Sequence, residues 1–359
     1  MAPDNLTLKI AGVSKTLGTF RLKPTSFEVE ANEYFVLLGP TGAGKTVLLE
    51  LIMGFHRPDE GKILLDNREI TNLPTEKRGI GYAPQNCPLF PHLNVFENVE
   101  FGLKMQRTTT ASRKKIVERM LELMDLQTIS ERMPPTLSGG ERQKTILARL
   151  LVTKPKVVLL DEPLTSIDTK TNRILRQELK RINSELKVAF VHVTHDQIEA
   201  FSLADKIAVI QNGEILQLGQ PATVLSNPAN EFVARFLGYE NVFRATLLKQ
   251  DENTSEVAID KTAIKLLGRL DRDRVTVAVR PENIVVTLKG NAFSENWNVL
   301  EGTITGYMDL GPIVEVNVDA GLALKALMDK RSFLESNLAI GEQVHAGFRI
   351  DSVKTVNTG

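Results

Sequence analysis

The sequence predicts an α/β domain followed by a smaller all-β domain. Over residues 1–238, apolar runs of strand length alternate with helix-like segments, a pattern typical of a mainly parallel sheet covered by helices on both faces. Beyond Gly238 the helical periodicity fades and short alternating strands follow. A chain of 359 residues is also too long for one ordinary hydrophobic core. We therefore expect one domain over residues 1–238 and a second over residues 239–359.

Individual segments of the first domain support this architecture. Buried strands are expected in "NEYFVLLGP", "KVVLLDEP" and "KVAFVHVTH", where apolar and β-branched residues run together. Helices are expected in "KTVLLELIMGF", "SRKKIVERMLELMDL" and "TNRILRQELKRIN", where apolar residues follow the helical period. The segment "KIAVIQNGEILQLG" predicts a hairpin that turns at Asn212 and Gly213 and closes the domain.

The second domain contains a weak internal repeat. "NVFRATLL" from Asn241 is similar to "NVLEGTIT" from Asn298, and the strand pattern that ends at Arg280 is similar to the one that ends at Arg349. Two similar β units in tandem favour a pair of small barrels of the oligomer-binding kind. The alternative is that short β segments resemble one another without any common architecture.

Composition limits the classes of function. Lys and Arg together number 44, as do Asp and Glu, so no basic bias indicates nucleic acid as a partner. The chain has one cysteine, Cys87, which excludes a disulfide framework and fits a reducing compartment. The N-terminus "MAPDNLTLKI" has no basic start or apolar core typical of a secretion signal. Apolar runs are far shorter than a membrane span. We expect a cytosolic protein whose membrane role depends on a partner.

The segment "GPTGAGKT" matches the pattern G-x-x-x-x-G-K-[ST], and it follows an expected strand and opens an expected helix. In this context the loop's glycines allow backbone N–H groups to surround phosphates, the lysine binds the β- and γ-phosphates, and the last hydroxyl is a Mg²⁺ ligand. The predicted ATP-binding residues are Gly39, Pro40, Thr41, Gly42, Ala43, Gly44, Lys45 and Thr46.

Four polar residues are expected at the carboxyl ends of other strands. Asp161 and Glu162 end "VVLLDEP", and we expect Asp161 to bind Mg²⁺ and Glu162 to activate water as a general base. Gln85 and His195 end their own strands, where ligands of open α/β sheets bind. Two adjacent carboxylates also occur in ordinary solvated turns, and the upstream phosphate loop favours the catalytic interpretation. His192 lies within an apolar run and is expected to be packed.

The stretch "LSGGE" predicts a turn that leads into a helix over "ERQKTILARLL". Adjacent glycines disfavour a helix interior, whereas a helix N-terminus presents free N–H groups to an anion. Ser138, Gly139, Gly140 and Glu141 thus form a second anion-binding candidate beside the phosphate loop.

Taken in order, "GPTGAGKT", "APQ", "LSGGE", "VVLLDEP", "SID" and "VTHD" resemble the ATP-binding subunit of an ABC transporter, and the resemblance covers the whole chain. It implies an ABC-type ATPase domain with a helical subdomain, with ATP and Mg²⁺ as ligands. By this resemblance Gln85 contacts Mg²⁺ and the permease, Glu162 is the catalytic base, and His195 contacts the γ-phosphate. Ser138 to Glu141 would bind ATP held by a second protomer, and Asp168 would lie at the dimer contact. A homodimer is implied.

The same resemblance implies further partners at the cytoplasmic face of the membrane, namely two transmembrane permease subunits and an extracytoplasmic substrate-binding protein. The segment after Gln85 resembles the permease-docking surface, and its apolar residues Leu89, Phe90 and Phe96 are expected to be exposed. A helical-domain core would explain Phe96 equally well. Leu17 stands where relatives carry an aromatic residue that stacks on adenine, and Phe20 is the candidate substitute.

The C-terminal region resembles the regulatory TOBE/Mop-like unit of molybdate/tungstate importer ATPases. An oxyanion site there could use Lys330, Arg331 and Ser332, although a basic turn capped by serine is a common start of a helix. Import of molybdate or tungstate is the favoured function. The alternatives are the same machinery with sulfate, ferric iron, a sugar or a polyamine as cargo, a soluble ABC ATPase acting on DNA or ribosomes, and an intracellular oxyanion store.

Overall fold

The computed structural model describes residues 6–106, 108–165, 167–288 and 293–357, and the chain divides into two compact units, Met1–Pro221 and Ala222–Gly359. The division falls near the start of α7 (Pro221–Ser226), whereas the sequence suggested residue 238. The helix α8 (Glu231–Phe236) follows α7. Within the second unit, Ala234 of this helix packs with Tyr239, Ala278 and Val356, which explains why α8 groups with the β-rich part.

The first unit is built on a six-stranded sheet of order β10-β9-β3-β8-β7-β6. The strands are β3 (Tyr34–Leu38), β6 (Ile80–Ala83), β7 (Val157–Asp161), β8 (Ala189–Thr194), β9 (Lys206–Gln211) and β10 (Glu214–Gly219). All neighbours pair in parallel except β9 and β10, which form the expected hairpin. Asn212 and Gly213 both have positive φ at its turn, as a type I′ turn requires.

A second, antiparallel sheet of order β2-β1-β4-β5 was not anticipated from the sequence. It consists of β1 (Leu6–Leu17), β2 (Phe20–Glu30), β4 (Glu60–Leu65) and β5 (Arg68–Glu69). Leu8 and Ile10 of β1 share one hydrophobic core with α1 (Lys45–Met53) and with one face of the central sheet. The helix α1 is therefore enclosed between the two sheets.

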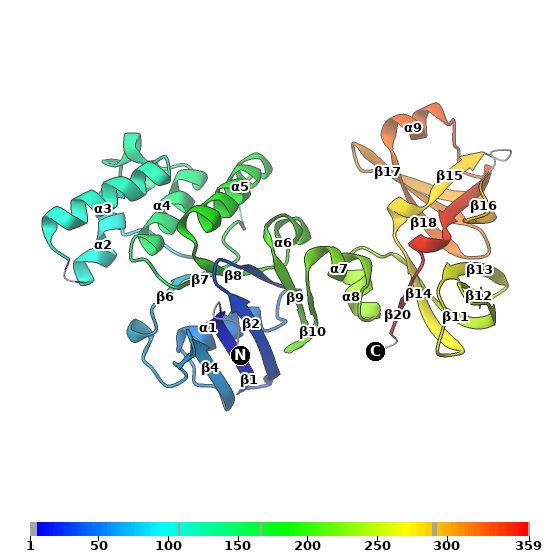
Figure 1. Ribbon diagram of the computed structural model, residues 1–359. Coiled ribbons are helices and arrows are strands. Elements are labelled where there is room, and N and C mark those ends of the chain that lie inside the picture. Colours follow the sequence, from blue (N-terminus) through cyan, green and yellow to red (C-terminus); the bar gives the residue numbers. More distant parts are fainter. Residues whose placement is uncertain (1–5, 107, 166, 289–292, 358–359) are drawn as a thin grey trace. The chain divides into compact units, whose positions relative to one another are not determined.

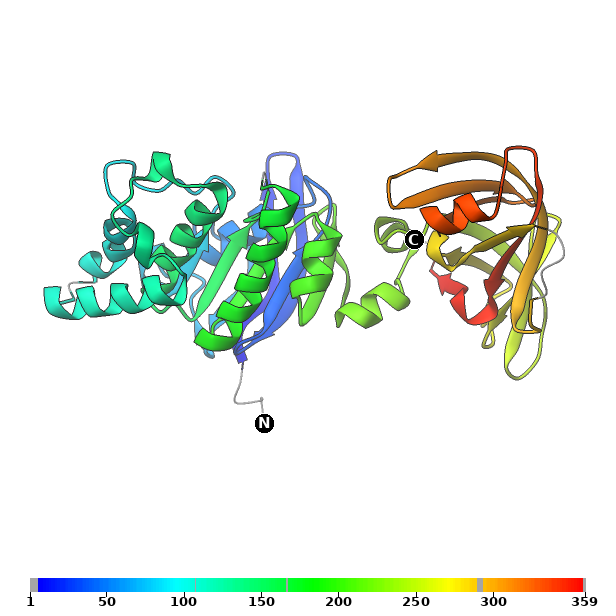
Figure 2. The same cartoon turned by 90° about the horizontal axis from the view of Figure 1, so that it is seen from above.

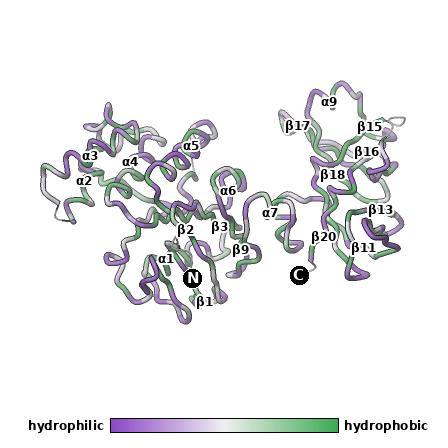
Figure 3. The backbone as a smooth tube through the Cα atoms, viewed as in Figure 1, coloured by the Kyte–Doolittle hydropathy of each residue, from purple (hydrophilic) through white to green (hydrophobic). Residues whose placement is uncertain are grey.

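Helices α5 (Thr169–Leu186) and α6 (Gln197–Leu203) cover the opposite face of the central sheet (Figures 1 and 2). Because side chains alternate along a strand, Phe35 and Leu37 point into the core around α1 while Tyr34 faces α5, whose Lys180 ammonium lies 5.7 Å from the Tyr34 ring centre. Figure 3 shows this contrast as hydrophobic central strands and a largely hydrophilic α5. No helix of the described residues combines the length and hydropathy needed to cross a membrane.

The helical subdomain contains α2 (Val95–Met105), α3 (Thr110–Leu123) and α4 (Gly139–Leu151). The helix α4 begins at Gly139, so both glycines of "LSGGE" are its first residues instead of a preceding turn. Short 3-10 turns lie at Thr75–Lys77, Gln127–Ile129 and Pro134–Thr136.

The second unit contains two five-stranded sheets, of order β13-β12-β11-β14-β20 and β15-β19-β16-β17-β18. The first repeat supplies β11 (Asn241–Gln250), β12 (Thr254–Ile259), β13 (Thr262–Leu267), β14 (Arg274–Val279) and β15 (Val285–Leu288). The second supplies β16 (Trp297–Asp309), β17 (Ile313–Asp319), β18 (Ala323–Asp329), α9 (Lys330–Glu335), β19 (Gln343–Arg349) and β20 (Lys354–Val356). Each repeat gives its last strand to the other sheet, because β15 pairs with β19 and β20 with β14.

Candidate functional site

The predicted site residues meet at the carboxyl edge of the central sheet. The phosphate loop follows β3, Asp161 ends β7, His195 follows β8 and Gln85 follows β6. The strands β3, β8, β7 and β6 are successive neighbours that run in parallel, so their ends lie at one edge, the usual ligand-binding edge of such sheets.

The phosphate loop has the open geometry of an anion site. Gly42 and Gly44 have φ values of 81° and 102°, which favour glycine. No side chain caps the start of α1, so its backbone N–H groups remain available to an anion. A side chain at Gly44 would have its Cβ 2.4 Å from the Cζ atom of Phe20. The Phe20 ring therefore lies against the loop, and its stacking on adenine stays a prediction.

Lys45 is held inside this loop. Its ammonium group donates to the carbonyl oxygens of Gly39 at 2.8 Å and Pro40 at 2.9 Å and lies 3.9 Å from the Glu162 carboxylate. Burial lowers the pKa of Lys45, against the opposing effect of the nearby carboxylates of Glu162 and Asp161. The result is a shielded cation beside the loop's amides.

Thr46 and Asp161 form a pair of oxygen donors beside the loop. The Thr46 hydroxyl donates to the Asp161 carboxylate at 3.2 Å. Burial raises the pKa of Asp161, partly offset by that hydrogen bond. A buried carboxylate next to a hydroxyl fits Mg²⁺, which binds proteins through one or two carboxylates together with phosphate and water oxygens.

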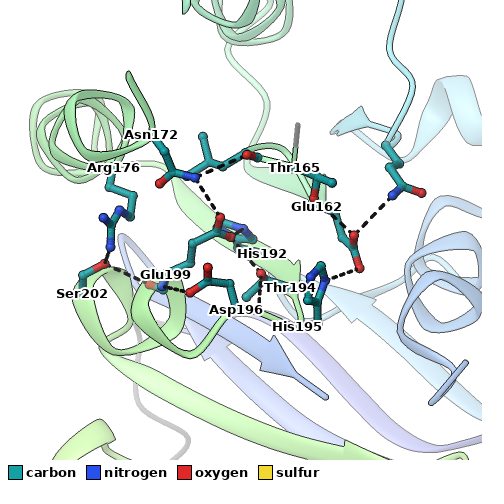
Figure 4. A network of polar contacts seen from close by, with 12 residues as sticks. Glu162, Thr165, Asn172, Arg176, His192, Thr194, His195, Asp196, Glu199 and Ser202 are labelled. Carbon is teal, nitrogen blue, oxygen red and sulfur yellow. Dashed lines mark hydrogen bonds and ion pairs between the residues drawn. The ribbon is translucent and has the colours of Figure 1, made fainter. Parts of the chain in front are cut away.

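Several side chains of the site contact the Glu162 carboxylate (Figure 4). Its carboxylate accepts from Gln85 Nε2 at 3.2 Å and from the Thr165 hydroxyl at 3.2 Å, and it lies 3.1 Å from His195 Nδ1. Glu162 also has a left-handed backbone, φ 48°, a strained conformation for a non-glycine residue that is often found at functional sites. The strand-end residues Gln85, after β6, and His195, after β8, thus converge on the carboxylate that follows β7.

The "LSGGE" stretch is a capping box. The Ser138 hydroxyl accepts from the Glu141 amide at 3.3 Å, and the Glu141 carboxylate accepts from the Ser138 amide at 2.8 Å, which lowers the pKa of Glu141. Among the described residues these hydrogen bonds do not connect Ser138 with the phosphate loop. Asp168 similarly caps α5 by accepting from the Thr171 amide at 3.0 Å.

The oxyanion candidates of the second unit do not converge. Lys330 pairs with Asp309 at 2.7 Å and Arg331 with Glu335 at 2.7 Å. The cap of α9 is Asp329 instead of Ser332, whose amide donates to the Asp329 carboxylate at 2.9 Å. Each cation is therefore neutralised by its own carboxylate, and the helix start carries a negative charge that would repel an anion.

The apolar segment after Gln85 is less exposed than the sequence suggested. Leu89 is buried, and Phe90 packs on Phe101 with ring centres 4.4 Å apart. The guanidinium of Arg149 lies 5.0 Å from the Phe90 ring centre and donates to Cys87 Sγ at 3.0 Å. This segment therefore belongs partly to the helical-domain core.

Sequence reasoning missed three polar residues near the site, Thr165, Asn172 and Glu199. Asn172 and Glu199 bond to each other at 3.3 Å although they lie on different helices. The segment "VTHDQIEA" contains a signal for Glu199, because Asp196 is a helix cap and the Glu199 amide is its partner.

A glycine-rich loop that opens a helix after a central parallel strand, with two acidic residues at the end of a nearby strand, defines a P-loop nucleotide hydrolase. Comparison with known proteins narrows this class. Residues 22–165 match the ABC transporter family and residues 277–354 match the TOBE domain.

Two relatives match nearly the whole chain. The molybdate/tungstate import ATP-binding protein WtpC of Pyrococcus horikoshii is 38% identical, over 96% of this chain and 99% of the relative. The spermidine/putrescine import ATP-binding protein PotA of Nitrosomonas europaea is 37% identical, over 90% and 92%. The chain belongs to the ATP-binding proteins of the ABC transporter family and is an ATPase.

Two solved structures share the fold of the first unit. A dimeric ATP-binding cassette in a post-hydrolysis state, bound to ADP and Pi, matches with a TM-score of 0.53 and 29% identity, covering 60% of this chain and 98% of the other. The cbiO1 protein of Clostridium perfringens, part of the ABC transporter complex cbiONQ, matches with a TM-score of 0.58 and 25% identity, covering 61% and 90%.

Proposed function

We propose that Glu162 is the general base that activates the water attacking the γ-phosphate, with His195 and Gln85 orienting the reacting groups. The convergence of Gln85 and His195 on the Glu162 carboxylate, at 3.2 and 3.1 Å, is the observation that carries this proposal. A base within hydrogen-bond reach of orienting groups is what phosphoryl transfer to water requires.

Lys45 and the backbone amides at the end of the loop and the start of α1, such as those of Gly44 and Thr46, bind the phosphates, and Phe20, which lies against Gly44, contacts the nucleotide. Thr46, Asp161 and Gln85 would hold Mg²⁺. When bound, this ion neutralises charge on the transferred phosphoryl group. The pair of Thr46 and Asp161 oxygens, 3.2 Å apart, supports this assignment.

Two chains form a head-to-tail dimer in which the start of α4 completes the partner's ATP site. The capping box engages the amides of Ser138 and Glu141, so those of Gly139 and Gly140 are the ones a phosphate could take. A Cβ built at Gly139 meets nothing within 4 Å, so packing inside one chain does not require glycine there. Close approach of a phosphate bound by a second chain would require a glycine at this position. Asp168 lies at the dimer contact in this proposal.

A hollow of about 810 Å³ beside the site suits a partner helix. Its lining joins the segment after β6 to the start of α4, through Gln85, Pro88, Gly139 and Arg142 among others. A transmembrane permease subunit docked there would touch both Gln85, which bonds to Glu162, and the α4 start. We assign the chain to the cytoplasmic face of the membrane, with two permease subunits and an extracytoplasmic substrate-binding protein.

Molybdate or tungstate is the proposed cargo, because the relative named for these oxyanions is similar over 96% of this chain. A polyamine is the second candidate, supported by the relative named for spermidine and putrescine. Oxyanion sensing by the second unit would need residues other than Lys330 and Arg331, whose charges are already paired.

Deletion of the gene in its host tests the cargo. Cells are grown with trace tungstate and molybdate, and accumulated metal is measured by elemental mass spectrometry beside uptake of labelled spermidine. Loss of tungsten and molybdenum accumulation with normal spermidine uptake is the expected result. The reverse pattern would establish the polyamine alternative, and no change in either would reject both.

A further inference from the structure

A buried polar cluster lies beneath the candidate site, on the face of the central sheet that α5 and α6 cover (Figure 4). We call it the Glu199 network; it consists of Tyr34, Asn172, His192, Thr194 and Glu199. Tyr34 and His192 are fully buried, and Glu199 is 5% exposed. A carboxylate removed from water costs stability unless hydrogen bonds compensate it, so its partners indicate what the arrangement achieves.

One side of the network fixes the loop that carries His195. The Thr194 hydroxyl donates to Glu199 Oε2 at 2.8 Å and accepts from the Asp196 amide at 3.0 Å. The Asp196 carboxylate in turn accepts from the Glu199 amide at 3.0 Å. Both neighbours of His195 are therefore tied to Glu199 in a closed ring of hydrogen bonds.

The other side fixes the loop that follows Glu162. The Asn172 side-chain amide donates to Glu199 Oε1 at 3.3 Å and to the Leu164 carbonyl at 3.3 Å. Leu164 is followed by Thr165, whose hydroxyl donates to the Glu162 carboxylate at 3.2 Å. One carboxylate thus holds both loops whose side chains meet at Glu162.

A third contact supports the carboxylate from within the sheet. The Tyr34 hydroxyl lies 2.9 Å from His192 Nδ1, and His192 Nε2 lies 3.5 Å from Glu199 Oε2. A hydroxyl that donates to Nδ1 places the ring proton on Nε2, toward the carboxylate. Burial alone would raise the pKa of Glu199, but its contacts with His192, Thr194 and Asn172 outweigh burial and lower it.

We propose that Glu199 is a positioning residue for ATP hydrolysis, which sets the separation of His195 and Glu162 by fixing both of their loops. This inference rests on the roles proposed above for those two residues. Misplacement of a catalytic group by about 1 Å can cost about 100-fold in rate. The phosphate loop meets the network through a backbone hydrogen bond, from the Gly39 amide to the Thr194 carbonyl at 3.3 Å, which the side-chain variants retain. The loss should therefore appear in kcat and leave KM for ATP nearly unchanged.

The test measures steady-state ATP hydrolysis and thermal unfolding of the full chain. Glu199→Gln keeps the side chain's size but offers one acceptor oxygen where the carboxylate faces donors from Thr194, Asn172 and His192. We expect kcat to fall by about 10- to 100-fold, with KM within a factor of about two. Thr194→Val should reproduce this loss because it removes the linking hydroxyl, and Thr194→Ser should restore most of kcat because it keeps that hydroxyl.

A double variant that combines both substitutions distinguishes a shared positioning role from two independent structural defects. Because Glu199 acts through Thr194, Glu199→Gln with Thr194→Val should lose less than the product of the single effects. Thr25→Val is the matched control. It removes the hydroxyl of another buried threonine, on β2, which donates to the Lys23 carbonyl at 2.9 Å and belongs neither to the network nor to either loop, so it should keep kcat.

Three outcomes would overturn the proposal: normal kcat in Glu199→Gln, independent effects in the combined variant, or an equal loss in Thr25→Val. If Glu199→Gln does not fold, the Thr194 pair alone decides the question. Glu162→Gln measured beside these variants tests the catalytic base separately. Activity in that variant would reject the base assignment, whereas the positioning role is judged on kcat of the Glu199 and Thr194 variants.

Discussion

Replacing Glu162 with glutamine tests the central chemical assignment with little change of shape. The carboxylate accepts hydrogen bonds from Gln85 and Thr165 and lies 3.1 Å from His195 Nδ1. Glutamine keeps one acceptor oxygen and the same length but cannot take a proton from water. General-base catalysis contributes about 100- to 10 000-fold, so the barrier should rise by about 2.7–5.4 kcal/mol.

ATP binding should survive this change, because the phosphate loop and the start of α1 hold the phosphates through backbone amides and Lys45. Phosphate release is measured on the purified chain with Mg²⁺, and ATP-driven dimerisation by light scattering after gel filtration. We expect hydrolysis to fall to background while the ATP-bound dimer accumulates.

The matched control is Glu50→Gln, a carboxylate on α1 that lies 3.5 Å from His56 Nε2. It should hydrolyse ATP close to the wild-type rate. Undiminished hydrolysis in Glu162→Gln would refute the assignment of the base. Loss of ATP binding together with hydrolysis would show that Glu162 holds the site together instead of acting chemically.

Three further changes follow from the same geometry. Ser138→Arg should prevent ATP-driven dimerisation, measured by light scattering in a Glu162→Gln background, while fluorescent ATP still binds each chain; dimers of unchanged size would contradict it. Gly139→Ala should raise the melting temperature, since alanine is favoured over glycine in a helix by up to about 1 kcal/mol. The same variant should lower ATPase activity, because the added methyl group would obstruct the phosphate of ATP bound by the second chain. Asp161→Asn should abolish Mg²⁺-dependent hydrolysis and stabilise the nucleotide-free chain. Burial raises the pKa of Asp161, so the folded chain loses stability as pH rises through the interval between the ordinary and the raised pKa. Calorimetry at neutral pH without Mg²⁺ should therefore show a higher melting temperature for Asp161→Asn, and a lower one would contradict the burial argument.

The location of the site residues could be predicted from the sequence where each residue directly follows an apolar, strand-length run. The phosphate loop, Asp161, Glu162 and His195 each end an apolar run, and parallel strands must bring such ends to one edge. The hydrogen bonds among them were not predictable, because they depend on the order of β6, β7 and β8 in the sheet. Asn172 and Glu199 were missed for another reason, because a polar residue on an amphipathic helix is expected to face solvent until the packing of that helix is known.

The antiparallel sheet of the first unit was missed for a different reason. Its strand β2 alternates buried and exposed residues along much of its length, with Leu22, Phe27 and Val29 buried. Such a strand carries a weaker signal than the continuous apolar runs of β3, β7 and β8, whose residues are all buried. Its core partner is α1, so the helix that follows the phosphate loop is packed on both sides.

The internal repeat of the second unit gains a physical explanation from two asparagines. Asn241 donates to the Lys325 carbonyl at 2.9 Å and accepts from the Lys325 amide at 2.7 Å. Asn298 makes the equivalent pair with Lys265, at 2.8 and 2.6 Å. Each asparagine is buried and binds the edge strand of the other repeat's sheet, β18 or β13.

Each asparagine pairs with backbone groups of an edge strand, β18 or β13, that would otherwise face solvent or another chain. The exchanged strands β15 and β20 close the same two sheets from their opposite edges, and one hydrophobic core contains residues of both repeats, such as Val257 and Val316. Neither repeat therefore completes its own sheet or its own core. The tandem β units indicated by the sequence are halves of one folded body, and a ligand that perturbs one half must act on both.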